Sequence, residues 1–238
     1  MGIEAGIEFL ARGGLNLFAI LDCLDLPEHV IEMMVNSGVS LAEYRRLVLV
    51  GHGGRRMWEE LQRVGMETAD PIDHYSISLT QQFIDNYLDA QPVFWLYPNR
   101  PYIIPLQQLG ALGGWSYASP LGSGISPVFG VWFAYRAAFL THAQLPIIIQ
   151  DPKPSPCASC DDKPCIMTCP AKAVEQERFD IHACVNHRLQ ANSTCADRCL
   201  ARMACPYFPN HQYSLEQIQY HYSRSLTGLQ VWHDSADS

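Results

Sequence analysis

The sequence lacks the segments that would carry it to or through a membrane. No N-terminal stretch combines a basic start with an apolar run, as a signal peptide would. The longest apolar stretches, such as VWFAYRAAFL at 131–140, are far short of the roughly 20 residues that span a bilayer. We therefore expect a cytoplasmic protein without membrane insertion.

Basic residues are also few. Sixteen Lys and Arg residues stand against 24 Asp and Glu residues, for a formal net charge of -8. Nucleic-acid-binding proteins normally present a basic face, so we do not expect nucleic acid as a partner. The chain has neither a P-loop lysine nor a dinucleotide fingerprint. We interpret the glycine-rich GHGG (51–54) and LGSG (121–124) as tight turns, with anion sites as the less favoured alternative.

Cysteine is nearly absent from the first 156 residues, where only Cys23 occurs, and eight more then fall within 49 residues. A chain of 238 residues that is 48% hydrophobic can bury a core without disulfides. In a reducing cytosol, clustered cysteines favour metal ligands or redox groups. Cys23 follows an apolar run, which indicates a small buried side chain and not a nucleophile.

The spacing of the eight cysteines is typical of iron–sulfur ligation. Bacterial two-cluster ferredoxins use C-x2-C-x2-C-x3-C-P, in which the fourth thiolate binds the other cluster. Here the first group is spaced C-x2-C-x4-C-x3-C-P, and the second ends in C-x3-C-x5-C-P. By the same crossover we assign two 4Fe–4S clusters to two sets of ligands. The first set is Cys157, Cys160, Cys165 and Cys205; the second set is Cys169, Cys184, Cys195 and Cys199.

Three alternatives remain open for these cysteines. Zinc also takes four cysteines, although in separated C-x2-C pairs without Cys-Pro closures. Disulfides are a second alternative. The extra residues in both groups leave a third, in which only one cluster is complete. His182 and His187 flank Cys184, and we interpret them as shaping the cluster pocket or donating hydrogen bonds that tune its potential.

The first half of the chain alternates strand-like with helix-like segments. We predict strands at 15–22, 47–50 and 93–97, helices at 27–37, 55–65 and 78–90, and either state at 131–140. Ser40 and Glu43 have the spacing of a capping box. This order predicts an α/β sandwich. Prolines at 152–156 then suggest a linker, so we expect domains at 1–150 and 151–212, with a C-terminal helix and tail at 213–238.

Two further stretches carry a resemblance to a known family. PYIIPLQQLGALGGW (101–115) and ISPVFGVWF (125–133) precede a proline-rich passage into the cysteine groups. This order resembles the cobalamin-dependent epoxyqueuosine reductases and the related corrinoid reductive dehalogenases, over roughly residues 70–206. The resemblance implies a nitroreductase-like α/β (α+β) domain that holds a corrinoid beside a small bacterial-ferredoxin-like domain with two 4Fe–4S clusters.

The same resemblance suggests residues for a corrinoid pocket, with a flavin as the second choice of cofactor. Aromatic side chains would form its wall, and glycines would allow the backbone to approach the macrocycle. The alternative for each of them is an ordinary place in the core or in a turn. The candidates are Gly113, Gly114, Trp115, Tyr117, Gly122, Gly124, Trp132 and Phe133.

One departure from the family bears on the reaction. The family's proton donor is an aspartate three residues before the proline that matches Pro101, and here that position is Pro98, followed by Asn99 and Arg100. We therefore do not expect epoxide reduction on tRNA. Two hypotheses remain: an iron–sulfur oxidoreductase that passes electrons to a corrinoid or small-molecule substrate, or a ferredoxin-type electron carrier whose front domain only docks. Either would take electrons from a small donor of ferredoxin or flavodoxin type.

Overall fold

The computed structural model describes residues 2–88, 90–98 and 101–236, so Asn99 and Arg100 lie outside the described residues. The chain forms two compact units. Unit 1 consists of Met1–Ser116 and Phe133–Lys153, and unit 2 consists of Tyr117–Trp132 and Pro154–Ser238. One junction falls in the proline-rich linker. The predicted domain limits at residues 150 and 212 stay predictions.

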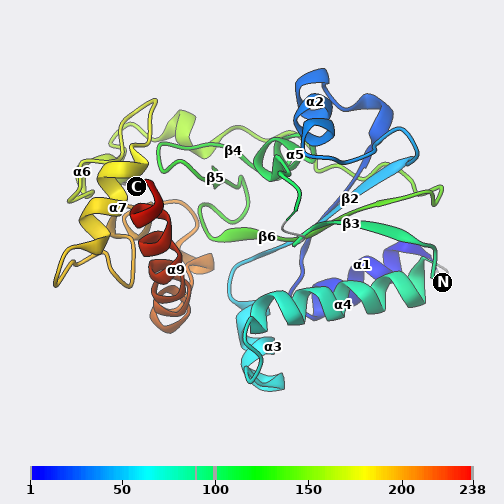
Figure 1. The fold of residues 1–238 in the computed structure, drawn as a ribbon, viewed down its shortest axis with the longest axis horizontal. Coiled ribbons are helices and arrows are strands. Elements are labelled where there is room, and N and C mark those ends of the chain that lie inside the picture. The colour runs from blue at the N-terminus through cyan, green and yellow to red at the C-terminus, as the bar shows by residue number, and fades with distance from the viewer. Residues whose placement is uncertain (1, 89, 99–100, 237–238) are drawn as a thin grey trace. The chain divides into compact units, whose positions relative to one another are not determined.

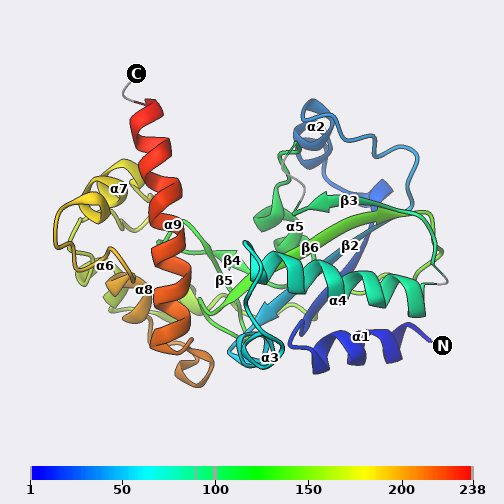
Figure 2. The same cartoon turned by 60° about the horizontal axis from the view of Figure 1, so that its bottom comes forward.

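Unit 1 is built on an antiparallel sheet with the strand order β1-β2-β6-β3. Helices α1 and α4 lie on one face of this sheet, and α2 and α5 lie on the other (Figures 1 and 2). The strands are β1 (Leu17–Asp22), β2 (Arg46–Gly53), β3 (Val93–Tyr97) and β6 (Phe133–Thr141). The helices are α1 (Ile3–Arg12), the 3₁₀ turn η1 (Cys23–Asp25), α2 (Glu28–Asn36), α3 (Arg56–Val64), α4 (Pro71–Tyr87) and α5 (Leu106–Leu112).

Coverage on both faces explains the sequence of the central strands. In β2, the seven residues after Arg46 are all buried, and β1 is buried up to its last residue. A strand that is covered on both faces reads as a continuous apolar run, because neither side alternates with solvent. The ambiguous segment 131–140 becomes strand β6 for this reason, since it lies between β2 and β3 at the centre of the sheet.

Most predicted elements of unit 1 are confirmed, and two details are wrong. The mixed α/β class and the strands and helices named above are present, but α4 begins at Pro71 and not at Ser78. Ser40 and Glu43 start no helix; the chain there makes a turn in which the Tyr44 amide donates to the Leu41 carbonyl at 3.0 Å. The spacing of a capping box is therefore insufficient where no amphipathic run follows it.

Unit 2 has little regular structure around the cysteines. A two-stranded ribbon pairs β4 (Tyr117–Ala118) with β5 (Gly124–Ile125), and the long helix α9 (Leu215–Ala236) packs against α7 (Ile181–Leu189). The remaining elements are η2 (Pro156–Ser159), α6 (Pro164–Met167), α8 (Leu200–Met203) and η3 (Pro209–His211). The ferredoxin-like character of this unit stays a prediction.

Residues 117–132 belong to unit 2 because their apolar side chains complete its core. Ile125, Val131 and Trp132 are buried together with Tyr213 and Ile218, and Cys157 and Cys205 pack against this group. A segment that precedes β6 in the sequence thus forms part of the core that supports the cysteines. This is a long-range contact that the sequence pattern did not predict.

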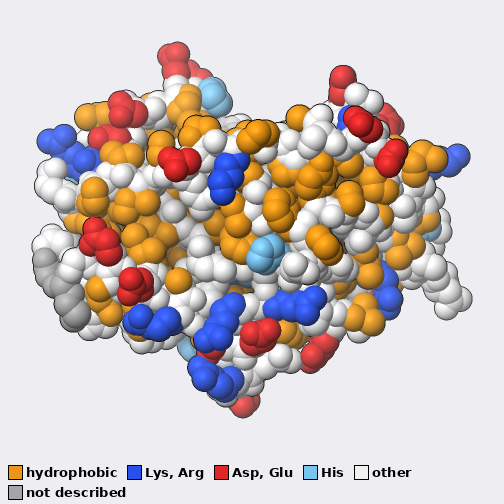
Figure 3. Space-filling view, turned by 180° about the vertical axis from the view of Figure 1, so that it is seen from behind, with side chains coloured by type: hydrophobic (Ala, Val, Ile, Leu, Met, Phe, Trp, Pro, Cys, Tyr) orange, Lys and Arg blue, Asp and Glu red, His pale blue; other side chains and the backbone are white. Residues whose placement is uncertain are grey.

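The surface is mixed in character. Acidic and basic side chains are interspersed with hydrophobic ones on the face drawn in Figure 3. Met167, which lies between two of the cysteines, is 83% exposed. Within the described part of the chain, no helix has the length and apolar character needed to cross a membrane.

Candidate metal centre

The first set of cysteines surrounds one cavity. Cys157, Cys160, Cys165 and Cys205 all line it, together with apolar residues that include Ile125 and Val131. The pKa of Cys157 is raised to about 11, mainly by burial and in smaller part by the nearby thiols of Cys205, Cys165 and Cys160. Cys165 shows the same grouping: its pKa is raised by burial and by the thiols of Cys205 and Cys160. These four side chains therefore lie within electrostatic reach of one another.

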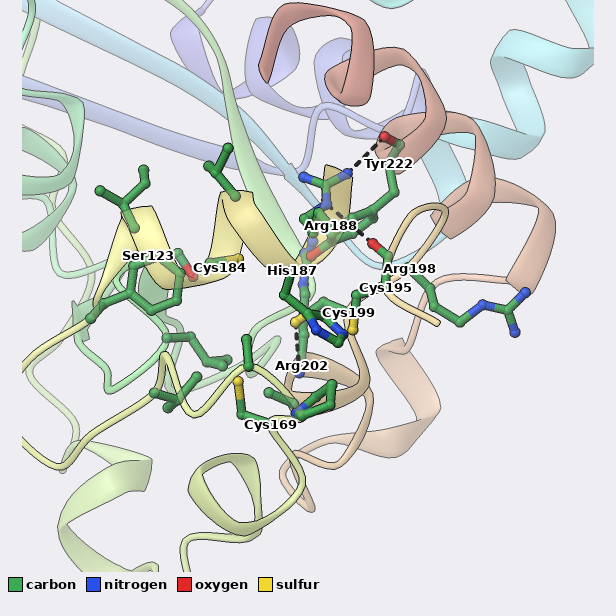
Figure 4. A pocket seen from close by; sticks show the side chains of 18 of the residues that line it. Ser123, Cys169, Cys184, His187, Arg188, Cys195, Arg198, Cys199, Arg202 and Tyr222 are labelled. Carbon is green, nitrogen blue, oxygen red and sulfur yellow. Dashed lines mark hydrogen bonds between the residues drawn. The ribbon is translucent and has the colours of Figure 1, made fainter. Parts of the chain in front are cut away.

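The second set surrounds a separate cavity of unit 2. Cys169, Cys184, Cys195 and Cys199 line it, and their sulfur atoms are turned toward a common space (Figure 4). The pKa of Cys184 is raised to about 11, mainly by burial and in smaller part by the thiols of Cys199, Cys169 and Cys195. The second cavity has about 280 Å³ of free space and the first about 20 Å³, so the two sites are not equally open.

Local backbone structure explains why neighbouring cysteines separate into different sets. Helices α6 and α8 each span four residues and contact each other. Each is followed, after a capping residue, by a Cys-Pro pair: Cys169–Pro170 after α6, and Cys205–Pro206 after α8. The residue before a proline is disfavoured in the helical region, so the helix ends and the last cysteine turns away from the others in its segment.

Two arginines that the sequence analysis did not single out line the second cavity. Arg188 is 8% exposed, and its guanidinium donates to the carbonyl oxygens of Cys195 (3.1 Å), Ala196 (3.3 Å) and Tyr222 (2.9 Å). Arg202 donates to the carbonyl oxygen of Val131 at 2.6 Å and 3.1 Å. Figure 4 shows both arginines in the wall of this cavity, with the Arg188 guanidinium directed toward Tyr222.

Aromatic rings hold both guanidinium groups in position. The Arg202 guanidinium carbon lies 4.8 Å from the centroid of the Trp132 ring and 5.2 Å from that of Tyr213. The Arg188 guanidinium carbon lies 4.9 Å from the centroid of the Tyr222 ring. Such contacts favour a cation over the ring face and fix its direction.

The two predicted accessory histidines differ in position. His187 lines the second cavity, and its buried Nε2 has no hydrogen-bond partner among the described residues. It can therefore donate into the cavity, as expected for a residue that tunes a cluster. His182 instead packs against the Trp232 ring with centroids 5.3 Å apart, and it is not among the cavity's lining residues.

All nine cysteines are free thiols, so no disulfide competes with the two sets. No three His, Cys, Asp or Glu side chains within residues 2–88, 90–98 and 101–236 converge closely enough for a single metal ion. Cys23 belongs to neither set. It is 4% exposed, and burial raises its pKa to about 12, as expected of a buried structural thiol.

The residues suggested for a corrinoid pocket fall into both units. In unit 1, Trp115 is fully buried, stacks on Tyr135 with centroids 5.5 Å apart, and donates from Nε1 to the Phe18 carbonyl at 3.4 Å. A Cβ on Gly113 would lie 2.9 Å from the Ala19 Cβ, and one on Gly114 would lie 2.6 Å from the Gln150 carbonyl oxygen. Phe133 is buried at the start of β6.

In unit 2, Tyr117 and Gly124 belong to the small ribbon, paired with Ile125 and Ala118. Gly122 has φ +71°, and a Cβ there would lie 2.8 Å from the Phe179 ring, so LGSG is a tight turn. Trp132 is buried and its Nε1 has no partner among the described residues. The contacts found for these eight residues are with protein, and their role in binding a corrinoid stays a prediction.

His52, in the GHGG stretch, is also part of the core. It is fully buried, and its Nδ1 accepts a hydrogen bond of 2.9 Å from Arg136 Nε on the neighbouring strand β6. The turn follows at Gly54, where φ is +74°.

The arrangement of the chain matches that of solved enzymes. An epoxyqueuosine reductase from Bacillus subtilis, with its catalytic loop swung out of the active site, superposes with a TM-score of 0.58 at 12% identity over 90% of this chain and 67% of the other. The chain has the fold of the epoxyqueuosine reductases. One such reductase in complex with a tRNA stem loop matches at 0.57, with 12% identity over 91% of this chain and 68% of that one.

The epoxyqueuosine reductase from Streptococcus thermophilus superposes with a TM-score of 0.56 at 12% identity, over 87% of this chain and 66% of the other. This chain thus spans about two thirds of the length of those reductases. No family model and no curated protein matches the sequence. At 12% identity the likeness establishes the fold, and the activity has to be argued from this chain's own residues.

Proposed function

We propose that this chain is an iron–sulfur oxidoreductase whose two cysteine sets each hold a 4Fe–4S cluster and pass single electrons to a bound corrinoid. The observation that supports it most directly is the division of eight cysteines into two cavities of four. The clusters would supply one-electron chemistry when bound. The reductase fold and the motifs at 101–115 and 125–133 support the corrinoid part of the proposal.

The chain's own residues have separable tasks in this proposal. The eight thiols would bind iron as thiolates, which requires that each lose its proton on loading. Apolar side chains around the second cavity, among them Val174, Phe179 and Val185, would keep water from the cluster. His187 would donate a hydrogen bond to it, because its Nε2 is buried there without another partner among the described residues.

We also propose the partners. The electron donor would be a small ferredoxin or flavodoxin type of protein, and the substrate a small molecule or the corrinoid itself. The tRNA stem loop is a ligand of the solved reductase. With a net charge of -8 and Pro98 in place of the family's aspartate, we do not propose tRNA as the substrate of this chain.

The experiment is anaerobic reconstitution followed by addition of cobalamin. We expect about eight irons and about eight acid-labile sulfides per chain, as two cubes require. We also expect a shift of the corrinoid absorption band on binding and a second change on reduction with dithionite. About four of each would leave one cluster, and zinc without sulfide would contradict the cluster proposal. Two clusters without cobalamin binding would instead support a ferredoxin-type carrier with a docking domain.

A further inference from the structure

The two cysteine sets have different electrostatic surroundings. Arg188, Arg198 and Arg202 line the cavity of the second set, whereas Lys163 is the basic residue that lines the cavity of the first. The charge of Arg202 also reaches Cys205 of the first set, so Arg188 is the cation that distinguishes the two sets most clearly. The reduction potential of an iron–sulfur cluster depends on its net charge, on nearby charges and on hydrogen bonds to its sulfur atoms. A fixed difference in charge between two similar sites should therefore separate their potentials.

Arg198 contributes little to this difference, because a carboxylate neutralises it. Its Nε and Nη2 donate to the two carboxylate oxygens of Asp197 at 2.7 Å and 2.9 Å. Arg188 and Arg202 are different. Among the described residues neither forms an ion pair with a carboxylate, and their guanidinium groups contact carbonyl oxygens, a hydroxyl and aromatic rings.

Carbonyl oxygens and ring faces orient a guanidinium but leave its full positive charge in place. That charge acts strongly at the second set, because Arg188 is nearly inaccessible to solvent and water screens it poorly. Its donors bind backbone carbonyls of two separate segments, at Cys195 and Ala196 and at Tyr222 on α9. The side chain therefore cannot swing away from the cavity without breaking several hydrogen bonds.

Hydrogen bonds to sulfur occur at both sets, since backbone amides also donate to the thiols of Cys165 and Cys205 in the first set, so the difference between the sets rests on the arginine charges. The backbone amide of Arg202 donates to Cys199 Sγ at 3.4 Å, which Figure 4 shows as a dashed line. Donation to a ligand thiolate withdraws electron density and stabilises the reduced cluster. The buried Nε2 of His187 is a further donor in the wall of this cavity.

The first set lies in a more acidic loop. Asp161 and Asp162 stand between Cys160 and Cys165 and are exposed, and Lys163 follows them. Two carboxylates against one ammonium give that loop a net negative charge.

We propose that Arg188 and Arg202 raise the reduction potential of a 4Fe–4S cluster at the second set above that of a cluster at the first set. The second set would then take up the first electron delivered by a one-electron donor. The inference rests on the proposed function only in requiring that both clusters bind. In this proposal the two arginines act by placing positive charge beside the second cluster, and that charge determines which cluster is reduced first.

The test is an anaerobic redox titration monitored by electron paramagnetic resonance on the reconstituted protein. Cys160→Ala leaves only the second set complete, and Cys184→Ala leaves only the first, so each potential is measured alone. We expect the second set to be the more easily reduced. At a given potential, its ratio of reduced to oxidised cluster should exceed that of the first set at least tenfold, which is about 59 mV for a one-electron couple.

Charge variants separate the arginines from other causes. In the Cys160→Ala protein, Arg188→Gln and Arg202→Gln should each lower the reduction potential of the second-set cluster. Arg188→Lys and Arg202→Lys retain the positive charge and should lower that potential much less. Arg178→Gln is the matched control: it removes an exposed arginine of unit 2 that pairs with Glu175 and does not line the second cavity. It should leave the potential of the second set unchanged.

Two results would overturn the inference. One is a second-set potential equal to or below that of the first set; the other is an unchanged potential in both glutamine variants. Should those variants lose their cluster, the comparison of the two single-set proteins still decides the order of the potentials, and the lysine variants test the arginines. Failure of the cluster proposal looks different, because the wild-type chain would then contain no iron or sulfide and no titration curve would exist to compare. Two clusters without cobalamin binding would contradict only the corrinoid part of the proposed function and would leave this comparison intact.

Discussion

Cys165 lies in the short helix α6 and Cys169 follows its C-cap four residues later, yet they line different cavities. The thiol of Cys165 is grouped with those of Cys160 and Cys205, whereas that of Cys169 is grouped with Cys184. The crossover assigns the two cysteines to different proposed clusters. A single cysteine substitution in this segment should therefore affect one cluster and leave the other.

That expectation gives the first prediction. Cys165→Ala and Cys169→Ala should each reduce the reconstituted chain from about eight irons to about four, and the double variant should hold close to none. The two single variants should differ in the potential of the cluster that remains. Iron and sulfide analysis with a redox titration measures both. Cys23→Ala is the control and should keep all the iron; loss of all iron in either single variant would contradict two independent sets.

A second prediction concerns the ion pair between Asp22 and Arg46. They face each other across β1 and β2, with Nη1 and Oδ2 2.7 Å apart, and both side chains are largely buried. Arg46 Nε also donates to the Leu145 carbonyl at 2.7 Å. Arg46→Met leaves both partners without their donor, and we expect the free energy of unfolding to fall by about 1–3 kcal/mol.

Urea denaturation measures this change, and an exposed pair provides the control. Arg12 and Glu8 lie 4.0 Å apart on α1, and both side chains are exposed. Arg12→Gln should change the free energy of unfolding by less than about 0.5 kcal/mol. Equal effects of the two substitutions would show that burial does not set the strength of the Asp22 pair.

Much of the candidate site could be predicted from the sequence, because the relevant information is local. Cysteine spacing and the two Cys-Pro closures determine which thiols turn toward which cavity. The strands of unit 1 were also predictable, since near-continuous apolar runs such as LVLV need cover on both faces. Helix α4 was placed too late because its first turns, from Pro71 to Ile77, mix apolar and polar residues without a clear helical pattern.

The cations of the second set could not be predicted in the same way. Arg202 reaches the Val131 carbonyl, 71 residues earlier in the chain, and Arg188 reaches Tyr222 on α9. Both contacts depend on how distant segments pack, and an arginine in a helix is more often at the surface. The inclusion of residues 117–132 in unit 2 has the same origin, because Trp132 and Ile125 are buried against Tyr213 and Ile218.

A third prediction concerns the Cys23 thiol. Its pKa is raised to about 12 from an ordinary value of 9.0, mainly by burial and further by the Asp22 carboxylate. The native state therefore holds this proton more tightly than the unfolded chain does. The stabilisation is complete below about pH 9 and is lost as the pH rises from about 9 toward about 12.

Two measurements check this prediction. Iodoacetamide should modify Cys23 slowly in the native protein at about pH 7.5 and readily in urea, as read by mass spectrometry. Between about pH 9 and about pH 11, the thermal stability of the wild type should fall more than that of Cys23→Ala, which has no thiol to ionise. Rapid modification of Cys23 in the native state would show that its side chain is accessible.

The last prediction compares two glycines that have opposite surroundings. Gly114 has φ +73°, where a side chain is strained, and a Cβ there would lie 2.6 Å from the backbone oxygen of Gln150. Gly114→Ala should lower the free energy of unfolding by about 1–3 kcal/mol, since backbone cannot move aside as a flexible side chain would. Gly228 lies within α9, and a Cβ added there would meet nothing within 4 Å, so Gly228→Ala should raise the free energy of unfolding by about 0.5–1 kcal/mol. Urea denaturation of both variants measures the pair, and a stabilising alanine at Gly114 would contradict the tight contact between its turn and Gln150.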